Sequence, residues 1–221
     1  MKNVRNNLGT IVTAVVLTGS ILLLFTSCDH PEWQPQEELI HYLKDPKNEV
    51  VKLVSNEQLT SSLRYQPVDL IKWQFLEGKK DSLASWQEAS QYEQYHYFLY
   101  RITSMSGKDP LTSNLGASHD LNTSISTLSF RMAEYAKMIT MSGDTLPLVD
   151  SYFPRYFGHS KTVEMLLVFK ANDKESTDEF SVIIDDFGMQ TGDQSFNFQP
   201  EAIQRIPKLL ELKPYYAYEK N

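Results

Sequence analysis

Cys28 is the single cysteine of the 221-residue chain, so it holds the only thiol available for covalent chemistry. It stands just after an apolar stretch, residues 8–25, which itself follows the basic residues Lys2 and Arg5. A basic start, an apolar run and small residues before a cleavage point are typical of a secretion signal. The sequence therefore predicts an exported chain that is processed at Cys28 and contains no internal disulfide.

The motif at the processing point is Phe25-Thr26-Ser27-Cys28. It resembles the lipobox of bacterial lipoproteins, in which small residues precede a cysteine whose thiol receives a diacylglyceryl group before the preceding peptide bond is cut. Phe25 stands where the family usually has leucine. The resemblance implies signal cleavage between Ser27 and Cys28 and attachment of palmitate-like acyl chains at Cys28. Two or three such chains anchor a protein firmly in membrane lipid, whereas a single chain is marginal.

The resemblance also implies a location, the cell envelope of a Gram-negative bacterium, with the outer membrane favoured and the domain outside the cytoplasm. Asp29 resembles an inner-membrane retention signal of enterobacterial lipoproteins and also a surface-export signal of other lineages. The sequence therefore leaves open which membrane holds the protein and which side of that membrane the domain faces. The alternative is an uncleaved anchor, because the apolar run approaches the roughly 17–25 residues that span a bilayer. Small and hydroxyl residues dilute the run and favour the lipoprotein: Gly9, Thr10, Thr13, Thr18, Gly19 and Ser20.

Charge and composition limit the partners of the processed chain. Removing 27 of the 221 residues leaves 194 and takes away two positive charges, which changes the formal net charge from −7 to −9. Nucleic acid is excluded as a partner, because phosphate backbones need stripes of Lys and Arg that this acidic chain lacks. Without disulfides the fold must depend on packing, for which 11 Phe, 12 Tyr and 3 Trp supply large apolar areas.

Three parts are predicted along the chain: a signal peptide over 1–27, an acidic tether over 28–38, and a single globular domain over 39–221. The tether has two prolines and four acids but little aliphatic content. Hydrophobic periodicity in the domain predicts helices over 37–43, from Pro67, from Leu83, near 125–132 and from Pro200, the last ended by Pro207. Alternation predicts strands over 50–54, 59–65, 95–105, 163–169 and 180–184, with two more within 133–149.

These elements favour one fold class, α+β, with an antiparallel sheet or sandwich-like core and several short helices. The strand over 95–105 is apolar on both faces and is predicted to be central. Ser142-Gly143-Asp144 predicts a hairpin turn. The strands over 163–169 and 180–184 are predicted to pair with each other, and 107–119 is predicted to be a polar loop.

No motif in the chain predicts catalysis, a cofactor or a metal site. No two of its five histidines (His30, His41, His96, His119 and His159) have the i, i+4 spacing that places two imidazoles on one side of a metal. Asp185-Asp186-Phe187-Gly188 has the letters of a kinase magnesium motif without the accompanying loops. Together with Gly192 and Asp193 it predicts an ordinary turn rather than a calcium loop. No Gly-x-Ser-x-Gly elbow occurs.

Aromatic residues supply the remaining functional clue. Tyr92, Tyr95, Tyr97 and Tyr100 are predicted to be core or half-buried. The segment 152–159 combines four aromatic rings with Arg155 and Gly158 between two strands, so Arg155 and Tyr156 are candidate partner-binding residues. The competing interpretation is that Phe153 and Phe157 close the end of the core.

Two functions remain open at this point. The first is a membrane-anchored envelope lipoprotein that binds or scaffolds an envelope protein or glycan without catalysis and contacts membrane lipid through Cys28. The alternative is a hydrolase or lyase that acts on envelope glycans with carboxylates drawn from separate loops. Such an enzyme needs two carboxylates about 5–9.5 Å apart across a cleft.

Overall fold

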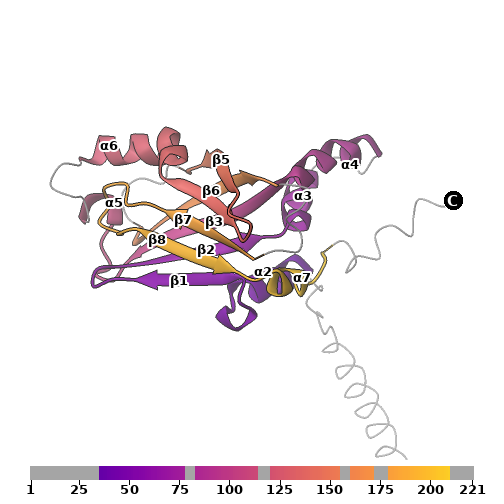
Figure 1. The fold of residues 1–221 in the computed structure, drawn as a ribbon, viewed down its shortest axis with the longest axis horizontal. Helices are drawn as coiled ribbons and strands as arrows, with labels where there is room; N and C mark the ends of the chain where they lie inside the picture. The colour runs from indigo at the N-terminus through magenta and orange to yellow at the C-terminus, as the bar shows by residue number, and fades with distance from the viewer. Residues whose placement is uncertain (1–34, 78–82, 114–119, 155–159, 172–178, 210–221) are drawn as a thin grey trace, which may run out of the picture. The chain divides into compact units, whose positions relative to one another are not determined.

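The computed structural model describes residues 35–77, 83–113, 120–154, 160–171 and 179–209 (Figure 1). Within these residues the fold is α+β, with one antiparallel sheet and several short helices, as the sequence predicts. No helix in this part of the chain has both the length and the apolar character needed to cross a membrane.

The sheet has eight strands in the order β1-β2-β3-β6-β5-β4-β7-β8, and every neighbouring pair is antiparallel. The strands are β1 (Val51–Ser55), β2 (Leu59–Gln66), β3 (Tyr95–Ser104), β4 (Ala136–Thr140), β5 (Thr145–Tyr152), β6 (Thr162–Lys170), β7 (Phe180–Ile184) and β8 (Gln194–Phe198).

The sheet curls until its two edge strands, β1 and β8, lie side by side, so that it is nearly barrel-shaped (Figure 1). The Lys52 ammonium lies 5.9 Å from the centre of the Phe198 ring across this seam. The Asn56 amide donates to the Gln190 carbonyl at 2.9 Å and ties the β1–β2 turn to the loop before β8. We call this arrangement the rolled sheet.

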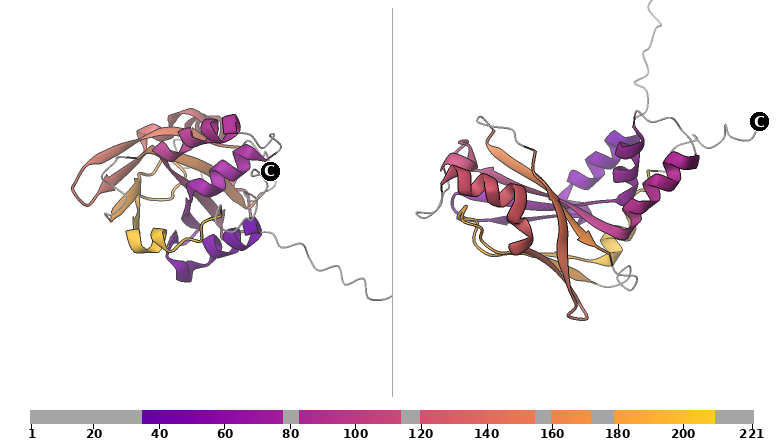
Figure 2. Two further views of the ribbon diagram at one scale, coloured as in Figure 1. Left: turned by 90° about the vertical axis from the view of Figure 1, so that its right-hand side faces the viewer. Right: turned by 90° about the horizontal axis from the view of Figure 1, so that it is seen from above.

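Short helices gather at the two ends of the rolled sheet (Figure 2). One end carries α5 (Pro110–Ser113) and α6 (Leu121–Ser126), the latter continued by a π-helical turn over Thr127–Arg131. The other end carries α2 (Pro35–Lys44), α3 (Val68–Leu76), α4 (Leu83–Ala89) and α7 (Pro200–Gln204). A second apolar cluster fills this end: Leu39, Leu43, Val50, Leu70, Ala202, Ile206 and Leu209.

The interior of the rolled sheet is an aromatic core centred on Phe98 of β3. The Phe98 ring lies within 6.0 Å, centre to centre, of four rings from four other strands: Tyr65, Phe169, Phe180 and Phe198. In each of the four pairs the planes of the two rings are inclined to each other, by 54–80°. Tilted and edge-on arrangements of this kind are the ones that aromatic quadrupoles favour. These contacts hold opposite walls of the sheet together without a disulfide.

Most predicted elements are confirmed, with small shifts at their ends. The strand over 95–105 is central, since β3 pairs with β2 on one side and β6 on the other. Gly143 takes a φ of +87° in the β4–β5 hairpin, a conformation that favours glycine. Helix α7 is short and ends before Pro207. Helix α2 starts at Pro35, so the last four residues of the predicted tether range are helical.

Two predictions of local structure are wrong, and one strand was not predicted. Strands β6 and β7 do not pair with each other, because β6 lies between β3 and β5 while β7 lies between β4 and β8. The predicted polar loop over 107–119 contains α5, whose Leu111 packs into the core. Residues 194–198, for which no element is predicted, form β8, with Phe196 and Phe198 facing inward. Strand pairing depends on the roll of the whole sheet, which local alternation does not encode.

Two leucines on opposite faces of neighbouring strands test this architecture. Leu63 of β2 is fully buried in the core, whereas Leu53 of β1 is 55% exposed on the outer face. We expect Leu63→Ala to lower the free energy of unfolding by about 2–5 kcal/mol, because it leaves a cavity among rigid rings. Leu53→Ala should change it by less than about 0.5 kcal/mol. Denaturant unfolding measures both values, and equal losses would contradict the assigned register.

Candidate functional site

The outer face of β1, β2 and β3 carries a groove of about 250 Å³. The strand residues that line it are Val51, Leu53, Ser62, Arg64, Leu99 and Arg101, and Lys44 and Pro46 flank it from the end of α2 and the turn that follows. We call it the β1–β3 groove. Strand register explains the set: Val51 pairs with Arg64, which pairs with Leu99. Side chains at alternate positions share one face of a strand, so the cross-strand partners project together away from the core.

Arg101 of the groove already has an acidic partner. Its guanidinium forms an ion pair with Glu164, the residue opposite it on β6, through both Nε and Nη2. Both side chains are about 40% exposed, at 41% and 37%, so the pair is screened by water and contributes little to stability. Its effect on the groove is to neutralise one of the cations.

Arg64 has a neutral partner instead. When the Gln66 side-chain amide is assigned with its oxygen toward the guanidinium, that oxygen accepts hydrogen bonds from Arg64 Nε at 2.9 Å and Nη2 at 3.2 Å. Burial, followed by the like charge of Arg101, lowers the pKa of Arg64, while Glu164 raises it. Among the residues that the structure describes, no carboxylate lies within 4.0 Å of the Arg64 guanidinium or the Lys44 ammonium.

The charges of the groove therefore oppose those of the whole chain. Lys44, Arg64 and Arg101 contribute three positive charges and Glu164 one negative charge, in a protein whose formal net charge is −7. Val51, Leu53 and Leu99 place apolar surface beside these cations. Such a site can bind an anion, because guanidinium groups donate strong, charge-assisted hydrogen bonds to oxyanions.

A second polar cluster lies inside the rolled sheet and has a structural role. The Tyr100 hydroxyl donates to the Gln194 side-chain oxygen at 2.8 Å, and the Gln194 amide donates to the Ser61 hydroxyl at 2.9 Å and the Thr191 carbonyl at 3.3 Å. Burial is the main cause that raises the pKa of Tyr100. The phenol therefore stays neutral and joins β3 to β8 and β2.

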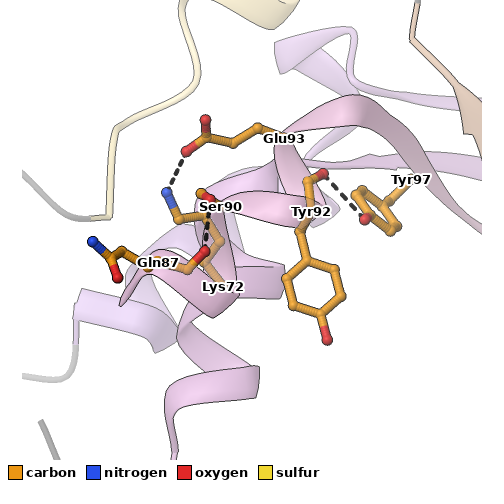
Figure 3. A network of polar contacts seen from close by, with 6 residues as sticks. All are labelled: Lys72, Gln87, Ser90, Tyr92, Glu93 and Tyr97. Atoms are coloured by element: carbon orange, nitrogen blue, oxygen red, sulfur yellow. Dashed lines mark hydrogen bonds and ion pairs between the residues drawn. The ribbon is translucent and has the colours of Figure 1, made fainter. Parts of the chain in front are cut away.

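A third polar cluster stabilises the helical end of the sheet (Figure 3). The buried Lys72 ammonium of α3 contacts the Glu93 carboxylate at 2.5 Å, and the Tyr97 hydroxyl donates to the Tyr92 carbonyl at 3.1 Å. Burial raises the pKa of Tyr97 to about 12. Tyr97 and Tyr100 are buried while Tyr92 and Tyr95 are half-buried, so the predicted core role of these tyrosines is confirmed.

The acidic loop after β7 uses two of its carboxylates to hold its own backbone. Asp186 accepts hydrogen bonds from the amides of Gly188 at 2.8 Å and Gly192 at 3.1 Å, and Asp193 accepts one from the Asp186 amide at 3.0 Å. These contacts are typical of a turn. Across the described ranges, no group of three or more His, Cys, Asp or Glu side chains is placed to hold a metal ion.

All four predicted site residues, Ser27, Cys28, Arg155 and Tyr156, lie outside the described residues, as do Phe157 and His159. Beside them, Tyr152 is 65% exposed at the end of β5 and Phe153 packs against the core. The partner-binding role of Arg155 and Tyr156 stays a prediction. Arg64 and Arg101 were not predicted as site residues, although each occupies an outward position of an alternating strand, which was the available signal.

Neither described groove supplies the carboxylate pair that glycan hydrolysis requires. The β1–β3 groove has no acidic lining residue. A second groove of about 310 Å³ on the outer face of β4, β7 and β8 has one, Glu179, among Ile139, Met141, Ile183 and neighbouring side chains. Comparisons with protein-family models, curated proteins and solved structures find no match.

His96, one of the two histidines among the described residues, lies beside the aromatic core. Its ring lies 5.8 Å from Phe180 and 6.3 Å from Tyr65, centre to centre, and both of its nitrogens are buried. Burial lowers the pKa of His96 to about 4. The native state therefore holds His96 neutral at pH values where an unfolded chain would protonate it.

This shift predicts acid sensitivity. As pH falls from about 6.5 to 4, the unfolded chain binds a proton that native His96 does not, so the free energy of unfolding should fall by up to about 3 kcal/mol. Above pH 6.5 His96 is neutral in both states, so its contribution to the free energy of unfolding no longer changes with pH. Denaturant unfolding of the wild type and of His96→Phe across this range measures the difference. The variant should lose this part of the pH dependence, and parallel curves would contradict the prediction.

Proposed function

We propose that this chain is a bacterial envelope lipoprotein whose folded domain binds a ligand without catalysing a reaction. The lipid is attached at Cys28 after cleavage of the signal peptide, and the domain lies outside the cytoplasm at the membrane that holds the lipid, with the outer membrane favoured. Cys28 carries the anchoring half of the proposal, because the chain's single cysteine stands directly after the apolar stretch, in a lipobox-like motif.

The ligand-binding half is supported by the β1–β3 groove. It places Lys44, Arg64 and Arg101 beside apolar side chains on an accessible face, and only Arg101 has a carboxylate partner among the described residues. Inside the rolled sheet, Tyr100, Gln194 and Ser61 instead form hydrogen bonds with one another. The glycan-hydrolase alternative remains a prediction that no specific observation favours.

Substitution of Cys28 tests the anchoring half. Cys28→Ala should leave the signal uncleaved and the chain without acyl groups, because no other thiol can accept the diacylglyceryl group. Intact-mass measurement should then show loss of the acyl mass and retention of residues 1–27, and incorporation of labelled palmitate should disappear.

The matched control is Ser27→Ala, which keeps a small residue before the cysteine and should be cleaved and acylated as in the wild type. A Cys28→Ala chain with the same mass, labelling and membrane attachment as the wild type would overturn the lipoprotein assignment. Retention of the unprocessed precursor in the inner membrane through its apolar stretch is compatible with it, because that stretch is then uncut.

A further inference from the structure

The β1–β3 groove contains a positive charge, that of Arg64, which has no direct anionic partner among the described residues and which an anionic ligand can stabilise. Arg64 is partly buried, its guanidinium bonds a neutral amide oxygen, and the second guanidinium beside it repels it. Removing a cation from water is unfavourable unless an opposite charge compensates. Glu164 forms its direct ion pair with Arg101 and acts on Arg64 only through space, as the smallest of the three influences on that pKa. Arg64 and Lys44 are therefore left to pair with an anion from outside the described part of the chain.

We propose that this groove binds a phosphate monoester group, and that an apolar part of the same ligand rests on Val51 and Leu53. The inference depends on the ligand-binding half of the proposed function and names the chemistry of that ligand. It does not depend on the lipid at Cys28.

Charge favours a phosphate monoester over a carboxylate. The three cations of the groove, less Glu164, leave two formal positive charges. A phosphate monoester carries about −1.5 to −2 at pH 7, which matches this value, whereas a carboxylate carries −1. The guanidinium N–H groups of Arg64 and Arg101 that Gln66 and Glu164 do not occupy can donate to phosphate oxygens, and Lys44 can add a point charge from the rim.

The volume of the groove and its apolar side chains limit what the rest of the ligand can be. At about 250 Å³ the groove lies below the roughly 300–1,000 Å³ that enclose a whole drug-sized molecule, so it suits a headgroup-sized portion. Leu53 is 55% exposed and Val51 is half-buried beside it on β1. An alkyl portion next to the phosphate would cover this surface and gain from leaving water.

The test uses the full-length processed protein, purified from membranes in a non-ionic detergent, and isothermal titration calorimetry. The probes are butyl phosphate, glycerol 3-phosphate and butyrate. We expect butyl phosphate to bind with a Kd of about 1 mM or tighter, a range reasonable for so small a ligand. Glycerol 3-phosphate should bind several-fold more weakly, because its polar body gains little from Val51 and Leu53.

Two groove variants should shift this affinity in opposite directions. Arg64→Gln removes the unneutralised guanidinium and should weaken butyl phosphate binding roughly tenfold or more. Glu164→Gln removes the one negative charge and should tighten it roughly threefold, which keeps the test informative if the first variant folds poorly. The matched control is Arg131→Gln, which makes the same charge change at an exposed arginine paired with Glu134. It should leave the Kd within about twofold.

Each contrary result would refute a particular part of the proposed site. No binding of either phosphate, equal weakening in Arg64→Gln and Arg131→Gln, or butyrate binding as tightly as butyl phosphate would each refute the phosphate site. Equal affinities for the two phosphates would refute the apolar contact on β1. Acylation of Cys28 is measured separately by mass, so failure of the groove and failure of the lipid anchor are distinguishable.

Discussion

The packing of Phe98 against rings from four other strands is the constraint on which the rest of the structure depends. Tyr65 and Phe169 come from the two strands that pair with β3, whereas Phe180 and Phe198 come from β7 and β8 at the far end of the strand order. A flat sheet would keep these rings far apart. The sheet must roll for them to meet, and the roll brings β1 beside β8 (Figure 1).

This roll decides where chemistry can occur. Its interior is filled by apolar and aromatic side chains, among which Tyr100 and Gln194 form a hydrogen bond with each other. Helices occupy the two ends (Figure 2). Outward side chains remain for recognition, and on β1, β2 and β3 they combine apolar surface with the cations Arg64 and Arg101. An acidic chain thereby presents a locally positive groove.

Local patterns predicted most elements because each depends on neighbouring residues. The apolar alternation of β3, the glycine turn at Gly143 and the proline that follows α7 act within a few positions, and all three are confirmed. The missed strand β8 offers only three inward positions, one of them the polar Gln194. The wrong pairing of β6 with β7 has a different cause, because their alternation is compatible with many neighbours and only the closed packing of the core selects among them.

The sequence by itself determined which residues of each predicted strand share a face, since side chains alternate along a strand. It also carries the whole basis for predicting a lipid at Cys28, because that motif acts in linear order. Only the tertiary structure decided that Arg64 and Arg101 share a groove and that Glu164 pairs with Arg101 but not Arg64. These residues lie on three separate strands, and the register that aligns them follows from the packing of the core rather than from any local signal.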